Sequence, residues 1–158
     1  MKHCLLLCAA LLFGAALADH TTDNLTPFEA VCINASYYEG EQDNDDVAGI
    51  IVDAMYDQLD AAGIAVADSP CQPKGLLGNK QLNLYFSFDS TEEGDAYSVG
   101  LTGWLDQDGP FKSVDVWTTG RFGSLKADTG QAKALTLLSS TLGEFVKEWQ
   151  KAHPAPTP

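Results

Sequence analysis

The chain has 158 residues, with 22 Asp or Glu against 9 Lys or Arg, and a formal net charge of −13. An acidic surface of this kind repels nucleic acid phosphates and anionic lipid headgroups, which excludes both as expected partners. The length suits one domain with one hydrophobic core. We expect a signal peptide over residues 1–18, a single domain over 19–152 and a disordered tail over 153–158.

The first 18 residues have the composition of a secretory signal peptide. Lys2 precedes an apolar run over 5–17, and residues 16–18 (ALA) form a small-x-small cleavage pattern. The run is too short and wrongly flanked for a membrane span. The sequence therefore predicts an exported protein, periplasmic or secreted, with no membrane span.

Two cysteines, Cys32 and Cys71, follow the predicted signal peptide. In an oxidising compartment an even pair favours a disulfide. Their spacing fits no zinc pattern, and their separation excludes a CxxC redox motif. We expect the disulfide Cys32–Cys71.

The first strand is predicted at 28–33, followed by a polar loop over 34–46 whose second half, EGEQDNDD, is densely acidic. Hard oxygen ligands of this kind could hold calcium. The spacing of these acidic residues does not match the ligand positions of an EF-hand loop, however, and no glycine occupies the turn position of such a loop. A solvated loop leading into a helix explains them better, so we predict no metal site and no cofactor.

A helix is predicted over 45–62, with Asp45 or Asp46 at its N-cap and Gly63 at its end. Residues 64–67 then form a short predicted strand. Because this helix must bury an apolar stripe, it requires a sheet to pack on. The stripe consists of Val47, Ile50, Ile51, Ala54, Met55, Leu59 and Ala62.

After a Pro- and Gly-rich loop over 68–80, residues 81–88 alternate between apolar and polar side chains, which predicts a half-buried strand. Further strands are predicted at 97–105 and 111–119. The sequence DQDG at 106–109 is the turn signal of a hairpin between these two strands.

This hairpin predicts a candidate contact face on the sheet. A loop with an even number of residues puts Val99 and Leu101 on the same face as Val114 and Val116, and this aliphatic face would be the core face. Large aromatic side chains would then lie on the opposite face, where they either mark a contact site or are covered by a neighbouring loop. These side chains are Trp104, Phe111 and Trp117.

A second helix is predicted from a capping box at Asp128 and Gln131 to about Lys151. Its apolar stripe consists of Ala134, Leu135, Leu138, Leu142, Phe145, Val146 and Trp149. The expected fold is α+β: a mostly antiparallel sheet of four or five strands, with two helices packed on one face, in the order β-α-β-β-β-β-α.

The catalytic motifs that we sought do not occur. Beyond the predicted signal peptide the histidines are His20 and His153, one near each end of the chain, where a preorganised site is not expected. No G-x-S-x-G, G-x-G-x-x-G, P-loop or H-E-x-x-H motif is present. We therefore expect no catalytic residues.

The element order resembles the amino-terminal unit of several bacterial envelope proteins, on residues 28–36 (FEAVCINAS), the helix 47–62 and residues 63–66 (GIAV). These are the curli-assembly lipoprotein, the first domain of the Tol-system propeller protein, and the lipopolysaccharide-assembly and ABC-transport auxiliary lipoproteins. The chain departs from them in having no evident lipidated cysteine and in its cysteine pair. The resemblance implies an accessory or assembly role through protein contacts, and it carries over no functional residue.

The expected function is therefore that of a non-catalytic binding or accessory protein whose partner is another envelope or secreted protein. A small molecule is the alternative partner: a ligand carrier or small enzyme would have a pocket between the sheet and the long helix. Such a pocket would be lined by Phe86, Phe88, Leu138 and Phe145.

Overall fold

The computed structural model describes residues 22–67, 71, 80–106, 113–126 and 129–155. Within these residues the chain forms five strands, two α-helices and one short 3₁₀ helix. In chain order the elements are the 3₁₀ helix Thr22–Leu25, β1 (Ala30–Glu39), β2 (Gln42–Asp43), α1 (Asp45–Ala61), β3 (Gln81–Ser90), β4 (Ala96–Asp106), β5 (Ser113–Ser124) and α2 (Gly130–Ala152).

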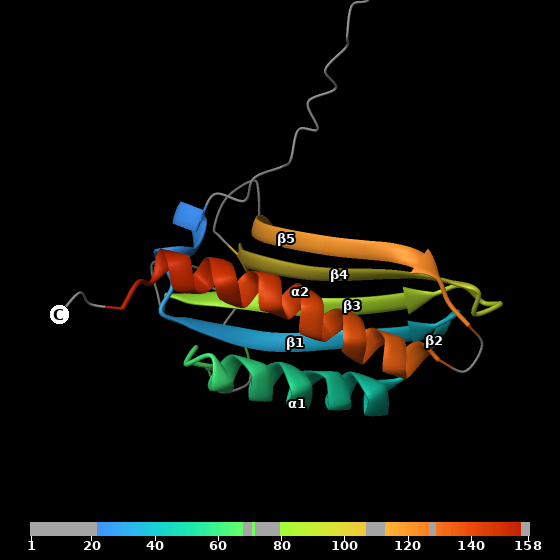
Figure 1. The fold of residues 1–158 in the computed structure, drawn as a ribbon. Coiled ribbons are helices and arrows are strands. Elements are labelled where there is room, and N and C mark those ends of the chain that lie inside the picture. The colour runs from blue at the N-terminus through green and yellow to red at the C-terminus, as the bar shows by residue number, and fades with distance from the viewer. Residues whose placement is uncertain (1–21, 68–70, 72–79, 107–112, 127–128, 156–158) are drawn as a thin grey trace, which may run out of the picture.

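The strands form one sheet in the order β2-β1-β3-β4-β5. β1 and β3 run parallel, because α1 connects them and returns the chain to the same end of the sheet, and the other neighbouring pairs are antiparallel. In Figure 1, α2 lies diagonally across one face of the sheet and α1 runs alongside β1. This arrangement confirms the predicted α+β fold with a mostly antiparallel sheet and two helices.

The hydrophobic core lies between the sheet and the helices. Every second side chain of β3 from Leu82 to Phe88 is buried, and on β1 the buried Tyr37 stacks on Phe88 with ring centroids 5.1 Å apart. Amphipathic α2 closes the core from the other side. Its buried apolar side chains are Ala134, Leu137, Leu138, Leu142, Phe145 and Trp149.

β1 is longer than the sequence predicted. A polar loop was expected from residue 34, but β1 continues to Glu39 and pairs back with β2. Tyr37 points into the core in this extension, and its polar neighbours Ser36 and Tyr38 lie on the opposite face of the sheet. The loop prediction was wrong because alternate polar residues are compatible with a strand that has one face open to solvent.

α1 begins at Asp45, and Asn44, rather than Asp45 or Asp46, caps it. The Oδ1 atom of Asn44 accepts a hydrogen bond from the amide of Val47 at 3.1 Å. Asp45 and Asp46 instead occupy the first turn, where negative charge is favourable near the positive end of the helix dipole. Gly63 ends the helical segment as predicted, with a left-handed φ of 71°.

The buried stripe of α1 differs from the predicted one. Ile50 was expected in the core and is 44% exposed, whereas Ala48 is buried. Ile50 lies about 100° around the helix from the buried Ile51, so burying Ile51 and Ala48 turns Ile50 outward. The buried residues are Val47, Ala48, Ile51, Met55 and Leu59.

The predicted strand at 64–67 is reduced to one isolated parallel bridge, between Val66 and Val31. The amide of Val31 donates to the carbonyl of Ala65 at 2.9 Å, and the amide of Ala67 donates to the carbonyl of Val31 at 2.7 Å. This segment therefore extends the β1 edge of the sheet at a single residue.

The predicted disulfide is confirmed. Cys32 of β1 is bonded to Cys71, with a Cα–Cα distance of 5.4 Å. The bond attaches the segment that follows α1 to the first strand of the sheet. In the part of the chain that the structure describes, no helix has both the length and the apolarity needed to cross a membrane.

The start of α2 does not show the predicted capping box. Asp128 lies outside the described residues, and the N-cap residue Thr129 makes no capping hydrogen bond with its side chain. Gly130 is the first residue of the helix and is buried.

The predicted tail is ordered at its first residue. The ring of His153 lies with Nδ1 2.9 Å from the carbonyl oxygen of Trp149 and Nε2 2.8 Å from that of Phe28. It also stacks on the ring of Trp149 at 4.5 Å. The prediction of disorder was therefore wrong at His153, and residues 156–158 lie outside the described part. With both ring nitrogens against backbone carbonyls, His153 joins the end of α2 to the start of β1.

Candidate functional site

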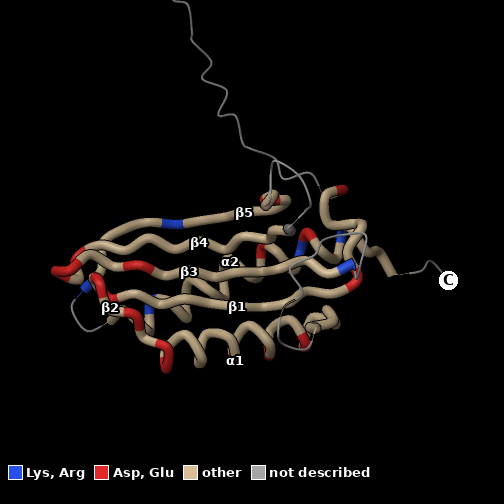
Figure 2. Tube along the Cα trace, turned by 180° about the vertical axis from the view of Figure 1, so that it is seen from behind, with Lys and Arg blue, Asp and Glu red and all other residues tan. Residues whose placement is uncertain are grey.

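The sheet face opposite the core, here called the outer sheet face, is covered by neither described helix. Figure 2 views the molecule from this side, with α2 behind the strands. The strand registers arrange its side chains in four rows across β1, β3, β4 and β5. The rows are Cys32, Asn83, Trp104 and Asp115; Asn34, Tyr85, Thr102 and Thr118; Ser36, Ser87, Gly100 and Gly120; and Tyr38, Asp89, Ser98 and Phe122.

Trp117 does not lie on the outer sheet face, so the predicted contact face of Trp104, Phe111 and Trp117 is corrected. Trp117 is 3% exposed in the core, opposite Gly103. Its indole meets Phe145 edge-on at 5.2 Å and donates to Glu148 at 2.8 Å. Phe111 lies outside the described residues.

A register shift explains this error. Gly103 pairs with Trp117 but Trp104 pairs with Asp115, so β5 carries one extra residue at this point. An extra residue in one strand exchanges the faces of all side chains on one side of the irregularity. The hairpin argument assumed a regular ladder and therefore placed Trp117 on the wrong face. Trp104 is on the outer sheet face as predicted.

Three further aromatic residues, Phe122, Tyr85 and the half-buried Tyr38, lie on the outer sheet face and were not among the predicted contact residues. Phe122 is 87% exposed, and it was missed because 121–127 was expected to be a connector rather than part of β5. Tyr85 is half-buried and donates a hydrogen bond from its hydroxyl to Ser36 Oγ at 2.6 Å. The alternation of β3 already placed Tyr85 opposite the core.

One end of the outer sheet face is acidic. Asp and Glu positions, red in Figure 2, gather at the end where β2 lies and β3 turns into β4. The nearby negative charge of Asp43, together with burial, raises the pKa of Tyr38, and partial burial raises the pKa of Asp89. Among the described residues, no group of three or more His, Cys, Asp or Glu side chains is placed to hold a metal ion.

A small pocket lies at the other end of the outer sheet face, beside the disulfide. It has a volume of about 90 Å³ and is lined by Cys32, Asn34, Cys71, Asn83, Leu84, Tyr85 and Trp104. The disulfide and Trp104 make most of this lining apolar. The pocket is thus a recess on three strands, β1, β3 and β4, beside Cys71, which the disulfide bonds to β1.

Asn83 supplies an unpaired polar atom in this lining. The residue is 5% exposed, and its Oδ1 atom has no hydrogen-bond donor among the residues that the structure describes. Burying such an acceptor without a partner destabilises the fold by about 1–3 kcal/mol. Native structures have few such atoms.

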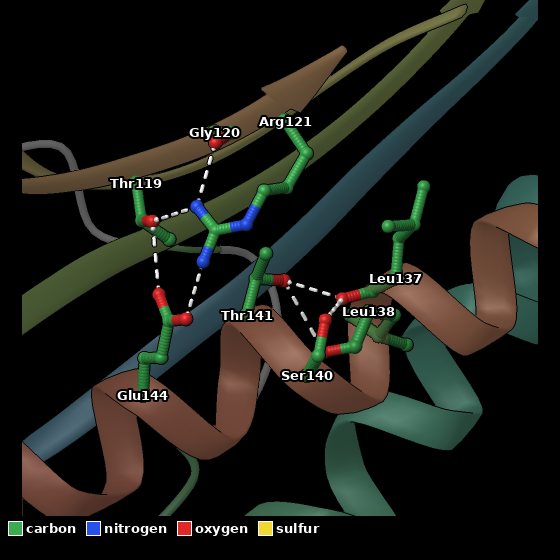
Figure 3. A network of polar contacts seen from close by, with 8 residues as sticks. All are labelled: Thr119, Gly120, Arg121, Leu137, Leu138, Ser140, Thr141 and Glu144. Atoms are coloured by element: carbon green, nitrogen blue, oxygen red, sulfur yellow. Dashed lines mark hydrogen bonds and ion pairs between the residues drawn. The ribbon is translucent and has the colours of Figure 1, made fainter. Parts of the chain in front are cut away.

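Polar contacts on the opposite face hold α2 to β5. Arg121 donates to Glu144, to Thr119 Oγ1 at 3.1 Å and to the carbonyl of Gly120 at 2.7 Å, and Thr119 donates to Glu144 at 3.0 Å (Figure 3). Arg121 and Glu144 are each about two-fifths exposed, so solvent screens this ion pair and its stabilisation is about 0–1 kcal/mol. The network fixes the position of α2 on the sheet.

A carrier or small enzyme was expected to have a ligand pocket between the sheet and the long helix. Its four predicted lining residues are all buried in the hydrophobic core cluster, and the pocket described above lies on the other side of the sheet. They are Phe86, Phe88, Leu138 and Phe145.

Comparisons with known proteins do not identify a family. No family model and no curated protein matches this sequence. The crystal structure of an uncharacterized protein is similar, with 11% identical residues and a TM-score of 0.40 over 77% of this chain and 92% of that one. The resemblance to envelope accessory domains stays a prediction.

Proposed function

We propose that this protein is an exported, non-catalytic accessory protein of the bacterial cell envelope that binds a partner protein through its outer sheet face. The observation that carries the proposal is the aromatic side chains of that face: Phe122 is 87% exposed in the same row as the half-buried Tyr38, and Trp104 and Tyr85 are half-buried farther along the face. Aromatic residues are enriched in protein interfaces, and an exposed apolar patch often marks one.

Charge favours a partner with a basic surface. The chain has a net charge of −13, and the described rows of the outer sheet face contain Asp89 and Asp115 but no Lys or Arg. Complementary charge on the partner would accelerate association and orient the two proteins, since rim charges act mainly on the association rate.

Export is supported by two independent features. Disulfides form and persist in oxidising compartments, and Cys32 and Cys71 are bonded. The sequence before the described residues has the pattern of a signal peptide.

Site-specific photocrosslinking in the native host tests the proposal. Replacing Phe122 with photoreactive p-benzoylphenylalanine places the probe on the outer sheet face. We expect an adduct with one protein after illumination, and we expect about 1 M salt to reduce its yield, because the Debye length then falls to about 3 Å.

Tyr56 provides the matched control, because it is also an exposed aromatic residue (50%) but lies on α1. The same probe at Tyr56 should give no such adduct. Equal adducts from the two positions, or no protein adduct from Phe122, would contradict a docking role for the outer sheet face.

A further inference from the structure

β5 is the terminal strand of the sheet, and part of its outer edge is open. At the opposite end of the sheet, β1 is flanked by β2 and α1. The 3₁₀ helix contacts β5, and Asn24 Nδ2 donates to the carbonyl of Val116 at 3.2 Å. Beyond Val116, no other element that the structure describes hydrogen-bonds to the backbone of β5 from this side. The edge from Thr118 to Ser124 is therefore open to pairing with another strand.

The hydrogen-bond pattern shows which backbone groups of β5 face this edge. In an antiparallel ladder, residues whose N–H and C=O groups face the neighbouring strand alternate with residues whose groups face away. Leu125 donates to the carbonyl of Asp95 at 2.6 Å, so the odd-numbered residues over 117–123 face β4. The carbonyl of Gly120 accepts from Arg121 Nη1 at 2.7 Å and keeps a second lone pair. The residues with outward groups are all exposed: Thr118, Gly120, Phe122 and Ser124.

The side chains along this edge are complementary to a second copy of the same edge. When two copies lie antiparallel with Gly120 on the two-fold axis, Arg121 of each copy lies opposite Thr119 of the other. Thr119 already donates to Glu144 at 3.0 Å (Figure 3), so Arg121 meets a carboxylate of the second copy as well as its own. Moving the axis to Arg121 would place two guanidinium groups opposite each other, which is destabilising. Charge therefore favours the register centred on Gly120.

The antiparallel arrangement also keeps the most acidic regions of the two copies apart. Each copy has a net charge of −13, so two copies repel each other overall. Asp and Glu positions gather at one end of the sheet (Figure 2), and β5 ends there too, since Ser124 pairs with Ala96 where β4 begins. Two antiparallel copies place these acidic ends at opposite ends of the pair, where salt screens their repulsion. The edge itself contains no Asp or Glu over residues 118–124.

We infer that two copies of this chain pair edge to edge through Thr118–Ser124 of β5 and form one continuous sheet of ten strands, five from each copy. Because the edge lies in the plane of the sheet, this pairing leaves the outer sheet face of both copies open. The inference therefore goes beyond the proposed function and does not depend on it. About seven paired residues per strand make a small interface, so we expect a micromolar dissociation constant.

Sedimentation velocity of the protein with its disulfide intact tests the pairing. We expect the dimer fraction to rise from a minor to a major species between about 1 and 500 µM, as a micromolar dissociation constant requires. Thr118→Pro removes an outward N–H without breaking a bond to β4, and it should weaken the dimer at least about tenfold. The matched control Thr118→Val keeps that N–H and should keep the dimer. A wild type that stays monomeric, or a Thr118→Pro variant that pairs as well as Thr118→Val, would overturn the inference.

Hydrogen exchange followed by mass spectrometry locates the contact without any substitution. Residues 118–124 should exchange at least about tenfold more slowly in the dimer than in the dilute monomer, because their outward N–H groups become bonded. Residues 49–57 of α1 are the internal control and should exchange at the same rate in both samples. A dimer that leaves residues 118–124 unprotected uses another surface, and the assignment to the β5 edge would then be wrong.

The crosslink from position 122 separates this inference from the proposed function. In the paired edges Phe122 lies opposite Thr118 of the second copy, so an adduct of twice the mass of this chain reports the pairing of copies. An adduct with a different protein reports the proposed function, and each can fail without the other. Protection of residues 118–124 that arises only when a different protein binds would assign the edge to that protein and overturn the pairing of copies.

Discussion

Gly130 shows how a single position links the sheet to the long helix. It begins α2 directly against the side chains of Tyr37 and Glu39, whose hydroxyl and carboxylate are hydrogen-bonded to each other. Tyr37 is buried and stacked on Phe88, so it has little freedom to move away, and burial raises the pKa of its hydroxyl. A side chain at Gly130 would enter space that Tyr37 and Glu39 occupy.

Gly130→Ala should therefore lower the free energy of unfolding by about 1–3 kcal/mol, as overpacking does in other cores. Gly49, in the middle of α1, is the matched control because an added Cβ would meet nothing within 4 Å. Gly49→Ala should raise stability by about 0.5–1 kcal/mol through helix propensity. Urea unfolding followed by circular dichroism measures both, and a Gly130→Ala variant as stable as the wild type would refute the tight contact.

At the scale of elements, the register shift between β4 and β5 decides which of two tryptophan rings, Trp104 or Trp117, lies in the core. Trp117 lies under α2 against Phe145, and Trp104 lies on the outer sheet face. The space above Gly103 is taken up by neighbouring side chains, since a Cβ there would lie 3.0 Å from Leu82 Cδ2 and 3.5 Å from the Cβ of Trp117. We therefore expect Trp117 to contribute to stability and Trp104 to contribute to binding.

Trp117→Ala should destabilise the protein by about 3–5 kcal/mol, the usual loss for truncating a buried Trp. Trp104→Ala should lower stability by no more than about 1 kcal/mol, because its ring is partly in solvent. Thermal or urea unfolding of the two variants gives the comparison. Similar losses for both would mean that Trp104 is also a core residue, which would weaken the case for a contact face.

The sequence predicted those elements whose pattern is dictated by one buried face. Residues 81–88 alternate between apolar and polar side chains, and this pattern correctly predicted the strand β3. The apolar stripe around Leu138, Leu142 and Phe145 correctly predicted the helix α2. The shift at Gly103 could not be predicted, because an added residue in β5 leaves the local composition unchanged. The exposure of Ile50 likewise depends on where α1 meets β1 and α2. The pocket is formed by β1, β3, β4 and the disulfide together, so no single stretch of the sequence could predict it.

At the scale of the whole molecule, the disulfide connects parts that are otherwise held by few contacts. Residues 64–67 meet the sheet at the single bridge between Val66 and Val31, and Cys71 then returns the chain to Cys32 on the outer sheet face. The bond therefore attaches Cys71 covalently to β1. It also supplies one wall of the pocket.

Replacing both cysteines, Cys32→Ala with Cys71→Ala, opens a loop whose ends are 39 residues apart in sequence. The chain-entropy model then gives a loss of about 4 kcal/mol in the free energy of unfolding, because the unfolded chain gains freedom. Alanine is preferred to serine because Cys32 is buried and a hydroxyl there would need a partner. Wild-type protein reduced with dithiothreitol is the control and should lose a similar amount in urea unfolding. A double variant as stable as the oxidised wild type would show that the bond adds nothing to the fold, and the disulfide would then matter only as a wall of the pocket.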